Sequence, residues 1–194
     1  MSDEVTAATS LQSFERLYRQ EADPWQFASS AYELDRYAAI LRSLSRDHYH
    51  YAFEPGCSVG VLTAQLASRC DRVLAIDVAP SAVLRAQQRC SALTNVDIQV
   101  ADVGVVPGVS LFDLIVFSEI GYYFTRTHLS TIARRLAARL TDNGELIACH
   151  WLGHSRDHIL HGDEVHSELL QSLSLTVCRS ERHDQFRIES WTRS

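Results

Sequence analysis

The stretch Glu54-Pro55-Gly56-Cys57-Ser58-Val59-Gly60 decides the fold of this chain. It follows a strand-like run at 49–54 and opens a helical pattern at 59–68, so a glycine-containing turn joins a strand to a helix. Glycines at such a turn let the backbone approach a ligand closely, and the free N–H groups of the helix N-terminus favour an anionic group. Ser58 stands where the dinucleotide-binding pattern Gly-x-Gly-x-x-Gly has its second glycine, which weakens the case for NAD. Read alone, the stretch also fits a tight turn without a ligand.

Short apolar strands alternate with helices on the C-terminal side of this turn. We expect strands at 72–77, 96–101, 112–117 and 145–150, and helices from Pro80 and at 127–140, with Asp142-Asn143-Gly144 as the turn before the fifth strand. This alternation predicts a doubly wound sheet of parallel strands. After a helix near 163–172, strands at 175–181 and 186–192 are joined by a short polar connection, so these two must be antiparallel.

The N-terminal part reads differently, as two helices at 11–20 and 31–45 that are split by Ala22-Asp23-Pro24. In the second helix one apolar stripe recurs at helical spacing; it consists of Leu34, Tyr37, Ala38, Leu41 and Leu44. Residues 1 to about 10 are expected to be a frayed start. We therefore expect a single domain over residues 1–194, with a helical lid at 1–47 and a core at 48–194.

Composition excludes several classes of protein. The chain has 194 residues, 46% of them hydrophobic, which suits one globular domain with a substantial core. The formal charge of −6, from 24 acidic and 18 basic residues, argues against a nucleic-acid binder. Five cysteines without a CxxC spacing indicate reduced thiols. With no apolar run long enough for a membrane span and an acidic N-terminus unlike a signal peptide, the expected location is the cytoplasm, away from the membrane.

Acidic residues end three successive predicted strands. Glu54 ends the first, Asp77 ends the second and Asp102 follows the third. A carboxylate at Asp77 can accept both hydroxyls of a ribose, and one at Asp102 can accept an adenine amine. Taken singly, Asp77 also fits a helix cap and Asp102 a turn. Together the three predict a nucleoside site at the carboxyl edge of the sheet, at its topological switch point.

These features resemble the class I S-adenosylmethionine-dependent methyltransferases. More narrowly, the chain resembles the nodulation-protein-S-like N-methyltransferases from about Phe14 to its C-terminus. The motifs that carry this resemblance are Asp23-Pro24-Trp25, Ser30-x-Tyr32-Glu33-x-x-Arg36-Tyr37, Glu54-Pro-Gly-Cys-Ser-x-Gly60, Ser118-Glu119-x-x-Tyr122-Tyr123 and His150-Trp151. The chain departs from the family pattern at Ala31 and Ile120-Gly121. The resemblance implies a Rossmann-like α/β sheet of strand order 3-2-1-4-5-7-6, with a C-terminal antiparallel hairpin and an N-terminal helical lid.

The resemblance also implies roles for individual residues. It implies a site for S-adenosylmethionine, with S-adenosylhomocysteine as the product, formed by Trp25, Arg36, Glu54, Gly56, Ser58, Gly60, Asp77, Val78, Asp102, Val103 and Ser118. The acceptor pocket would hold Tyr32, Tyr122, Tyr123 and Trp151, with Glu119 and His150 as catalytic residues. Arg36 is expected to pair with the cofactor's carboxylate or, alternatively, with Asp35 or Glu33.

Four histidines, His150, His154, His158 and His161, have spacings that suggest metal ligands. However, Gly153 and the position of His150 at a strand end indicate that the four histidines do not share one continuous helix face. No acidic or cysteine residues complete a set of metal ligands with them. We therefore expect no metal, with His150 in the acceptor pocket and the other three in a polar loop.

The expected activity is methyl transfer (EC 2.1.1.-) to an amine on a small molecule or an amino sugar; the resemblance implies a deacetylated chitin-type oligosaccharide. Glu119 could orient a cationic amine, aromatic rings could bind its charge, and Glu119 or His150 could take the proton that the amine must lose. The alternative is O-methylation of a small hydroxylated metabolite with His150 as base. An NAD-dependent oxidoreductase and a non-catalytic nucleoside-binding module are weaker alternatives. The acceptor's identity, any lid movement and the choice between monomer and homodimer stay open.

Overall fold

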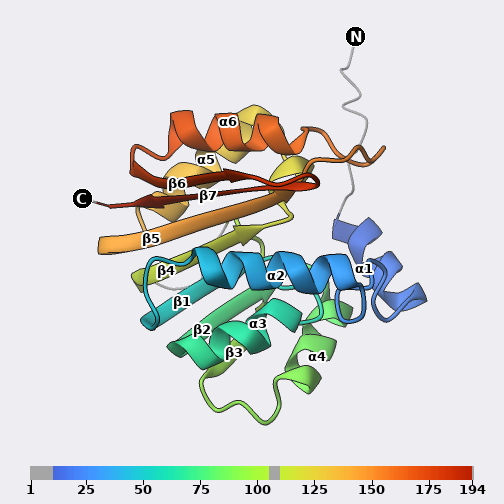
Figure 1. Cartoon of the computed structure of the whole chain (residues 1–194). Helices are drawn as coiled ribbons and strands as arrows, with labels where there is room; N and C mark the ends of the chain where they lie inside the picture. Colours follow the sequence, from blue (N-terminus) through green and yellow to red (C-terminus); the bar gives the residue numbers. More distant parts are fainter. Residues whose placement is uncertain (1–10, 105–109, 194) are drawn as a thin grey trace.

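Seven strands form one sheet in the order β3-β2-β1-β4-β5-β7-β6 (Figure 1). The computed structural model describes residues 11–104 and 110–193, so the frayed start expected for residues 1 to about 10 lies outside the described residues. The strands are β1 (Tyr49–Pro55), β2 (Cys70–Asp77), β3 (Val96–Val100), β4 (Phe112–Ser118), β5 (Leu140–Trp151), β6 (Thr176–Arg182) and β7 (Phe186–Thr192). Strands β3, β2, β1, β4 and β5 are parallel, and β7 is antiparallel to β5 and β6. The predicted fold class, strand order and C-terminal hairpin are confirmed.

Helices cover both faces of the sheet (Figure 1). The α-helices of the described chain are α1 (Leu11–Gln20), α2 (Ala31–Ser43), α3 (Val61–Leu66), α4 (Pro80–Arg89), α5 (Arg126–Ala137) and α6 (Gly162–Ser172). Alternate side chains of a strand point to opposite faces. In β2, Val73 and Ala75 therefore pack with residues of α3 and α4, whereas Leu74 packs with those of α5. No helix of the described residues has the length and apolar character needed to cross a membrane.

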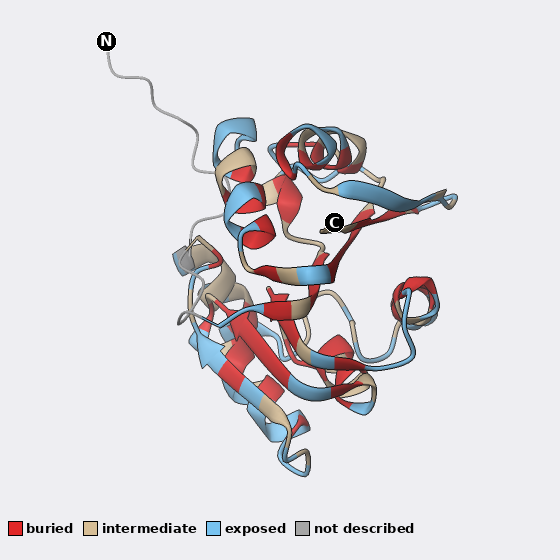
Figure 2. Ribbon diagram, turned by 90° about the vertical axis from the view of Figure 1, so that its left-hand side faces the viewer, coloured by how far each residue is buried: buried red, intermediate tan, exposed pale blue. Residues whose placement is uncertain are grey.

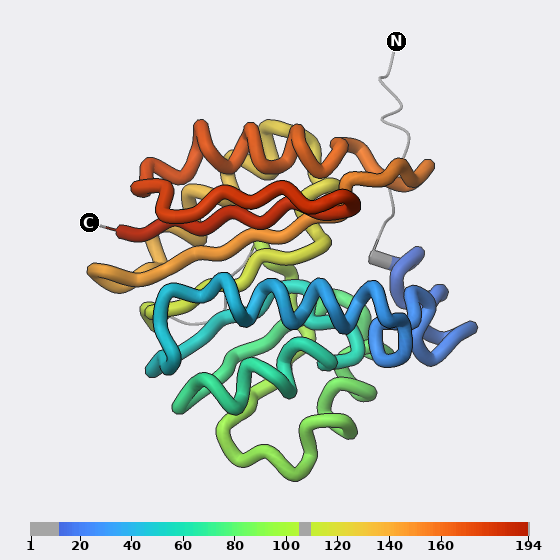
Figure 3. The backbone as a smooth tube through the Cα atoms, viewed as in Figure 1, coloured from blue at the N-terminus to red at the C-terminus, as the bar shows by residue number. Residues whose placement is uncertain are grey.

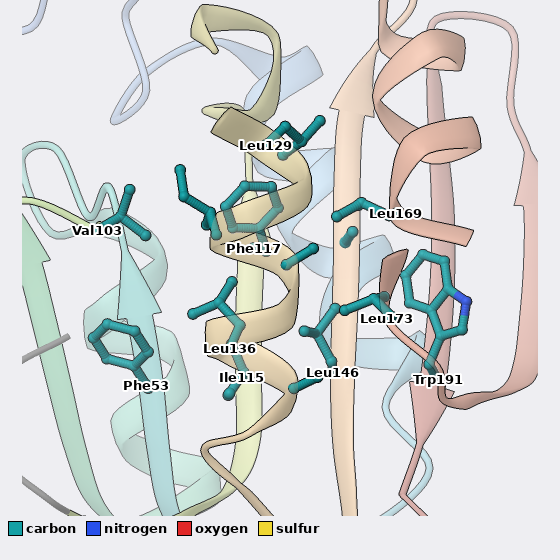
Figure 4. Packing of buried hydrophobic residues seen from close by; sticks show 14 of the residues in the cluster. Phe53, Val103, Ile115, Phe117, Leu129, Leu136, Leu146, Leu169, Leu173 and Trp191 are labelled. Atoms are coloured by element: carbon teal, nitrogen blue, oxygen red, sulfur yellow. The ribbon is translucent and has the colours of Figure 1, made fainter. Parts of the chain in front are cut away.

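The largest part of the core lies between the sheet and the pair α5 and α6 (Figure 4). Leucines at helical spacing, Leu129 and Leu136 of α5 and Leu169 and Leu173 of α6, point toward the strands and are almost fully buried. Trp191 of β7 closes this cluster and is itself completely buried. Figure 2 shows the buried residues along the inner strands and on the sides of the helices that face them. This core fixes the strand ends that carry the site.

Helix α2 is a layer of the core and not a removable cover. Ile40 is fully buried and packs in one cluster with Ala52 of β1 and Val116 of β4. The predicted stripe is wrong at Leu34, which is exposed, because Arg36 occupies the buried side of the first turns, where it pairs with carboxylates. Of the described N-terminal segment, α1 and the loop 21–30 lie beyond the strand ends, at the right of Figure 3. The part of the expected lid that covers the carboxyl edge is therefore 11–30.

Strand β5 begins at Leu140, five residues before the predicted start. Asn143, in the predicted turn, does adopt the left-handed conformation, with a φ of 58°. The backbone of this segment nevertheless stays paired, because Asn143 N–H donates to Arg193 O and Arg193 N–H donates to Gly144 O. The register against β4 shifts at the same point. The predicted turn is thus a bulge within a longer strand.

Candidate active site

A cavity of about 750 Å³ opens at the carboxyl edge of the parallel strands. A smaller cavity adjoins it and shares Gly56, Ser58 and Glu119 with it. Of the residues predicted from the sequence, the large cavity is lined by Trp25, Tyr32, Gly56, Ser58, Asp77, Val78, Asp102, Val103, Glu119, Tyr122, Tyr123 and Trp151. The small cavity adds Arg36, Glu54 and Ser118. Gly60 and His150 line neither cavity.

The two glycines of the β1–α3 turn have different roles. Both have a positive φ, 76° at Gly56 and 77° at Gly60, which glycine adopts at low cost. A Cβ on Gly56 would lie 2.4 Å from Ile120 Cγ2, so Ile120 packs directly on this turn where the cavities meet. A Cβ on Gly60 would lie 2.9 Å from Ala86 Cβ of α4. Gly60 therefore serves the close packing of α3 on α4, and the expectation that it lines the ligand site is not met.

Asp77 ends β2 and ties two turns to the rim of the large cavity. Its Oδ2 accepts the Ser58 N–H at 2.9 Å, and its Oδ1 accepts the Ala79 N–H at 2.9 Å. Burial raises the pKa of this carboxyl group above its ordinary value. Each carboxylate oxygen has two lone pairs, so Asp77 can still accept hydrogen bonds from a ligand.

Asp102 lies in a turn at the wall of the large cavity. Its Oδ1 accepts the Gly104 N–H at 2.6 Å, which makes it a turn residue, and it also lines the large cavity. Val103 next to it is buried and contributes to both the cavity wall and the core.

Helix α1 crosses the carboxyl edge of the sheet and is anchored on α4. The Glu15 carboxylate accepts hydrogen bonds from the Ser81 N–H and hydroxyl, which lowers its pKa to about 2. From the same helix, the Tyr18 hydroxyl donates to Ser58 Oγ at 2.5 Å. Phe14 lies edge-on to Tyr123, 4.9 Å between ring centroids. Through these contacts α1 spans the cavity from α4 to the loop after β4.

Phe14 and Tyr18 also line the large cavity, although neither is among the predicted site residues. Their spacing of four residues puts both rings on one face of α1. This spacing is the feature of the sequence that could have predicted their place at the cavity. Trp25, which was predicted, lies edge-on to Tyr18 at 5.5 Å and stacks on Phe27 at 5.7 Å. The lid thus presents an aromatic surface to the cavity.

A cluster of three charged residues, Glu33, Arg36 and Glu119, lies where the two cavities meet. The Arg36 side chain is fully buried, its Nη1 lies 2.5 Å from Glu119 Oε1, and its Nη2 pairs with Glu33 Oε2. Of the alternatives weighed for Arg36, the pairing with Glu33 is present, whereas Asp35 is exposed. Two carboxylates face one guanidinium, so this Arg36 charge cluster has a formal charge of −1 when all three groups are ionised.

Glu119 is held rigidly at the end of β4. Its backbone has a φ of 62°, which is uncommon for a residue other than glycine. Such strained backbone conformations often occur at functional sites. Its Oε1 accepts the Trp151 N–H at 2.8 Å in addition to the contact with Arg36, and its Oε2 accepts the Tyr122 hydroxyl at 2.7 Å. The carboxylate is therefore fixed by two hydrogen-bond donors, from β5 and the turn η2 (Gly121–Tyr123), and by the ion pair with Arg36 of α2.

The small cavity contains polar atoms without a partner. Ser118 Oγ and Arg36 Nε are buried and have no hydrogen-bond partner among the described residues. Glu54 lies nearby, accepts the Thr63 hydroxyl at 2.5 Å, and has its pKa raised to about 8 by burial. An unpaired hydroxyl and an unpaired guanidinium N–H are suited to an anionic group such as a carboxylate, which would satisfy both.

Aromatic rings form the opposite wall of the large cavity. His158, placed in a polar loop by the sequence analysis, stacks flat on Tyr122 with 3.7 Å between centroids. Trp151 and Tyr123 stand edge-on to His158. Burial lowers the pKa of His158, which favours its neutral form. His158 is therefore a cavity residue, and no local sequence signal distinguishes it from its neighbours in the loop.

His150 lies behind this wall, fully buried, and the expectation that it faces the pocket is not met. Its Nε2 accepts the Gly121 N–H at 3.1 Å, so its proton is on Nδ1, which lies 3.3 Å from His166 Nε2. His166 Nδ1 in turn lies 2.8 Å from Glu189 Oε2. Both nitrogens of His150 are thus occupied, because the strand turns this side chain into the core, and neither offers a free lone pair to the cavity.

The histidines at 150–161 serve separate purposes. His161 is the N-cap of α6, and its Nε2 contacts Leu152 O at 2.7 Å. His154 lines the cavity, with its ring 4.9 Å from that of His161. Within the described part of the chain, no three His, Cys, Asp or Glu side chains are grouped so that they could hold a metal ion.

Comparisons with known proteins show which family the chain resembles. The family model described as Nodulation protein S (NodS) matches residues 10–179. Nodulation protein S of Sinorhizobium fredii (strain NBRC 101917 / NGR234) is 35% identical over 143 residues, which cover 72% of this chain and 66% of that protein. The same-named protein of Bradyrhizobium diazoefficiens is 34% identical over 139 residues, 71% of this chain and 65% of its own. The matched part thus spans just under two thirds of these curated relatives.

A solved structure agrees with this result. The crystal structure of N-methyltransferase NodS from Bradyrhizobium japonicum WM9, in complex with S-adenosyl-L-homocysteine, matches with a TM-score of 0.84. The two chains are 26% identical, and the match covers 95% of this chain and 98% of that chain.

Proposed function

The chain belongs to the nodulation protein S family of class I S-adenosylmethionine-dependent methyltransferases, and from this premise we propose that it methylates the nitrogen of an amine. The observation that carries the proposal is the Arg36 charge cluster beside an aromatic wall. Its net negative charge attracts a protonated amine, and aromatic faces bind cations. An NAD-dependent oxidoreductase or a non-catalytic nucleoside-binding module would not explain both the family membership and the Arg36 charge cluster beside the aromatic wall.

The residues around the cavity fit S-adenosylmethionine. Asp77 would accept the ribose hydroxyls, and Asp102 with Val103 would hold the adenine. Ser118 Oγ and Arg36 Nε, which have no partner among the described residues, suit the carboxylate of the methionine end. When bound, S-adenosylmethionine supplies a methyl group on a sulfonium that needs no further activation.

The chain itself has to align the acceptor with that methyl group and exclude water. Alignment alone can lower the barrier by about 7–11 kcal/mol. Glu119, fixed by two hydrogen bonds and the ion pair with Arg36, would orient the amine, while Tyr32, Tyr122, Tyr123 and Trp151 would surround it. Aromatic faces also suit sugar rings, so the proposed acceptor is an amine on a small molecule or an amino sugar, such as a deacetylated chitin-type oligosaccharide. The relative solved with S-adenosyl-L-homocysteine is an N-methyltransferase, which supports nitrogen as the methylated atom.

The base that the sequence suggested for O-methylation does not face the cavity. A hydroxyl acceptor would need a base with a free lone pair in the cavity. His150, the residue expected to be that base, has both nitrogens engaged in the core.

The proposal extends to organisation and location. We propose one methyltransferase domain over residues 1–194, in which 11–30 covers the site. We also propose a cytoplasmic location, which the five free cysteines support, since four of them are buried thiols of the kind kept reduced there.

An acceptor panel tests the function. The purified chain is incubated with S-adenosylmethionine and glucosamine oligomers, with fully N-acetylated oligomers of equal length as the matched control. Simple amines, phenols and carboxylates complete the panel. Methyl transfer is expected for the acceptors with a free amine and not for the N-acetylated oligomers. Turnover of phenols or alcohols with none on any amine would overturn the proposal.

A further inference from the structure

Methyl transfer to an amine requires a group that removes a proton. A protonated amine has no lone pair, and the negative charge that attracts it also holds its proton in place. Glu119 is less suited to removing that proton, because Oε1 contacts both the Trp151 N–H and Arg36 Nη1, and the lone pair of Oε2 that the Tyr122 hydroxyl leaves free is needed to orient the amine. A second carboxylate of the same cluster is not restricted in this way.

That carboxylate is Glu33, in the first turn of α2. It lines the large cavity, and its side chain is only 11% exposed. Its Oε2 pairs with Arg36, whereas its Oε1 has no hydrogen-bond partner among the described residues. Because Arg36 uses Nη2 for Glu33 and Nη1 for Glu119, the guanidinium holds the two carboxylates next to each other at the same part of the cavity.

The surroundings of Glu33 make it a stronger base than an exposed glutamate. The titratable and charged groups that act on it come from α2, the loop before α2, the end of β4, and β5; they are Tyr32, Arg36, Tyr37, Asp23, Glu119 and Cys149. Burial, together with Glu119 and Asp23, raises the pKa of Glu33, and Arg36 offsets this only in part. A carboxylate whose pKa is shifted toward neutrality suits general-base catalysis.

We infer that Glu33 is a catalytic residue that takes the proton from the acceptor's ammonium group, while Glu119 orients the nitrogen. This inference rests on the proposed function. An N–H bond breaks, its electron pair stays on nitrogen, and the proton goes to Glu33 Oε1. The nitrogen pair then forms the N–C bond to the methyl group, while the electron pair of the C–S bond goes to sulfur. Glu33 afterwards releases its proton to solvent, and Arg36 acts as a positioning residue for both carboxylates.

The variant Glu33→Gln separates catalysis from structure, because glutamine keeps the shape and an acceptor for Arg36 but does not take up a proton. The rate of methyl transfer to a glucosamine oligomer is measured from pH 6.5 to pH 9.5 for the unchanged chain and for the variant. At pH 6.5 the variant is expected to be slower by about 10²-fold or more in kcat. At pH 9.5 the amine arrives without its extra proton, so the deficit is expected to shrink to a few-fold.

Controls exclude indirect effects. Asp35→Asn removes an exposed carboxylate from the same helix and is expected to leave the pH profile unchanged. Glu33→Asp keeps a base and is expected to regain part of the rate at pH 6.5. S-Adenosylhomocysteine affinity, measured by calorimetry, is expected to stay within about twofold for Glu33→Gln.

Two failures are distinguishable. If the unchanged chain turns over the amine and the Glu33→Gln deficit is the same at every pH, Glu33 is only structural and the inference is overturned. If the unchanged chain methylates no amine of the panel, the proposed function fails and the inference fails with it.

Discussion

At the scale of single residues, the carboxylate of Asp77 joins two turns to the ligand site. Both of its oxygens accept backbone N–H groups, from Ser58 and Ala79, at the rim of the cavity. A substitution there has to preserve shape if its effect on binding is to be separated from its effect on the turns.

Asp77→Asn is therefore the variant of choice. It removes the charge and places an amide NH₂ where a carboxylate oxygen accepted hydrogen bonds. Hydrogen bonds to a charged acceptor contribute roughly 1.5–3 kcal/mol each, so S-adenosylhomocysteine affinity is expected to fall about 10- to 100-fold by calorimetry. Asp97→Asn, at an exposed position on neighbouring β3, is the matched control. Unchanged affinity in a folded Asp77→Asn chain would remove Asp77 from the site.

The buried histidine pair predicts acid sensitivity. Burial lowers the pKa of both His150 and His166 below the ordinary value of 6.5. Below about pH 6.5 the unfolded chain therefore binds protons that the folded chain does not, so the free energy of unfolding decreases as the pH falls. Urea unfolding at pH 7.5 and pH 5.5 measures this loss, which is expected to be smaller in His166→Gln. The same loss in both chains would show that the pair does not contribute.

Residue roles could be predicted from the sequence only where they depend on position along the chain. Asp77 and Glu119 follow strands at the carboxyl edge, so their place at the cavity was predictable. His150 ends β5 in the same way, but its side chain turns into the core, where Gly121 and His166 engage both ring nitrogens. The direction of a side chain at the end of a strand depends on such long-range partners. The residues next to it in the sequence do not reveal which partners these are.

At the scale of elements, α1 and α2 differ although both are N-terminal helices. Helix α1 rests on α4 through Glu15 and covers the cavity, whereas α2 buries Tyr37, Ile40 and Leu44 against the sheet. Removing each of them therefore has a different consequence.

A chain that lacks residues 1–29 is expected to fold, because the core keeps all its layers, but to bind S-adenosylhomocysteine at least about tenfold more weakly. A chain that lacks residues 1–44 also loses the burial of Tyr37, Ile40 and Leu44, about 1.5–3 kcal/mol each, or roughly 5–9 kcal/mol. That loss is comparable to the total stability of a domain, so this chain is expected not to fold. Circular dichroism and calorimetry check both. A folded 45–194 fragment would contradict the assignment of α2 to the core.

The elements themselves were largely predictable, because strand and helix periodicities in this chain are strong. The errors occur where distant contacts override local signals. Asp142-Asn143-Gly144 has the sequence of a turn, yet Arg193, which follows β7, pairs with Asn143 and Gly144, and β5 begins before them. In α2 the buried face is decided by an arginine that meets a carboxylate 83 positions later, at Glu119.

At the scale of the whole molecule, the sheet brings together residues that are far apart in the sequence. Tyr18, Glu33, Asp77, Glu119 and Trp151 come from five different segments and meet at one cavity. The alternation of strands and helices predicted a parallel sheet, but the full strand order came from the resemblance to a family, since local patterns do not specify which strands are neighbours. The cavity's charge was not predictable either, because it depends on Glu33 and Glu119 sharing one buried arginine.

The proposed N-methylation is tested most sharply by identifying the atom that receives the methyl group. A glucosamine oligomer carries amines and hydroxyls on one molecule, so it offers both acceptors in direct competition. The purified chain is given this oligomer with S-adenosylmethionine labelled with ¹³C in the transferred methyl, and the product is examined by NMR. A labelled methyl on nitrogen is expected, and it should be absent when the oligomer is N-acetylated. A labelled methyl on oxygen, with the amine unmodified, would contradict the proposed N-methylation.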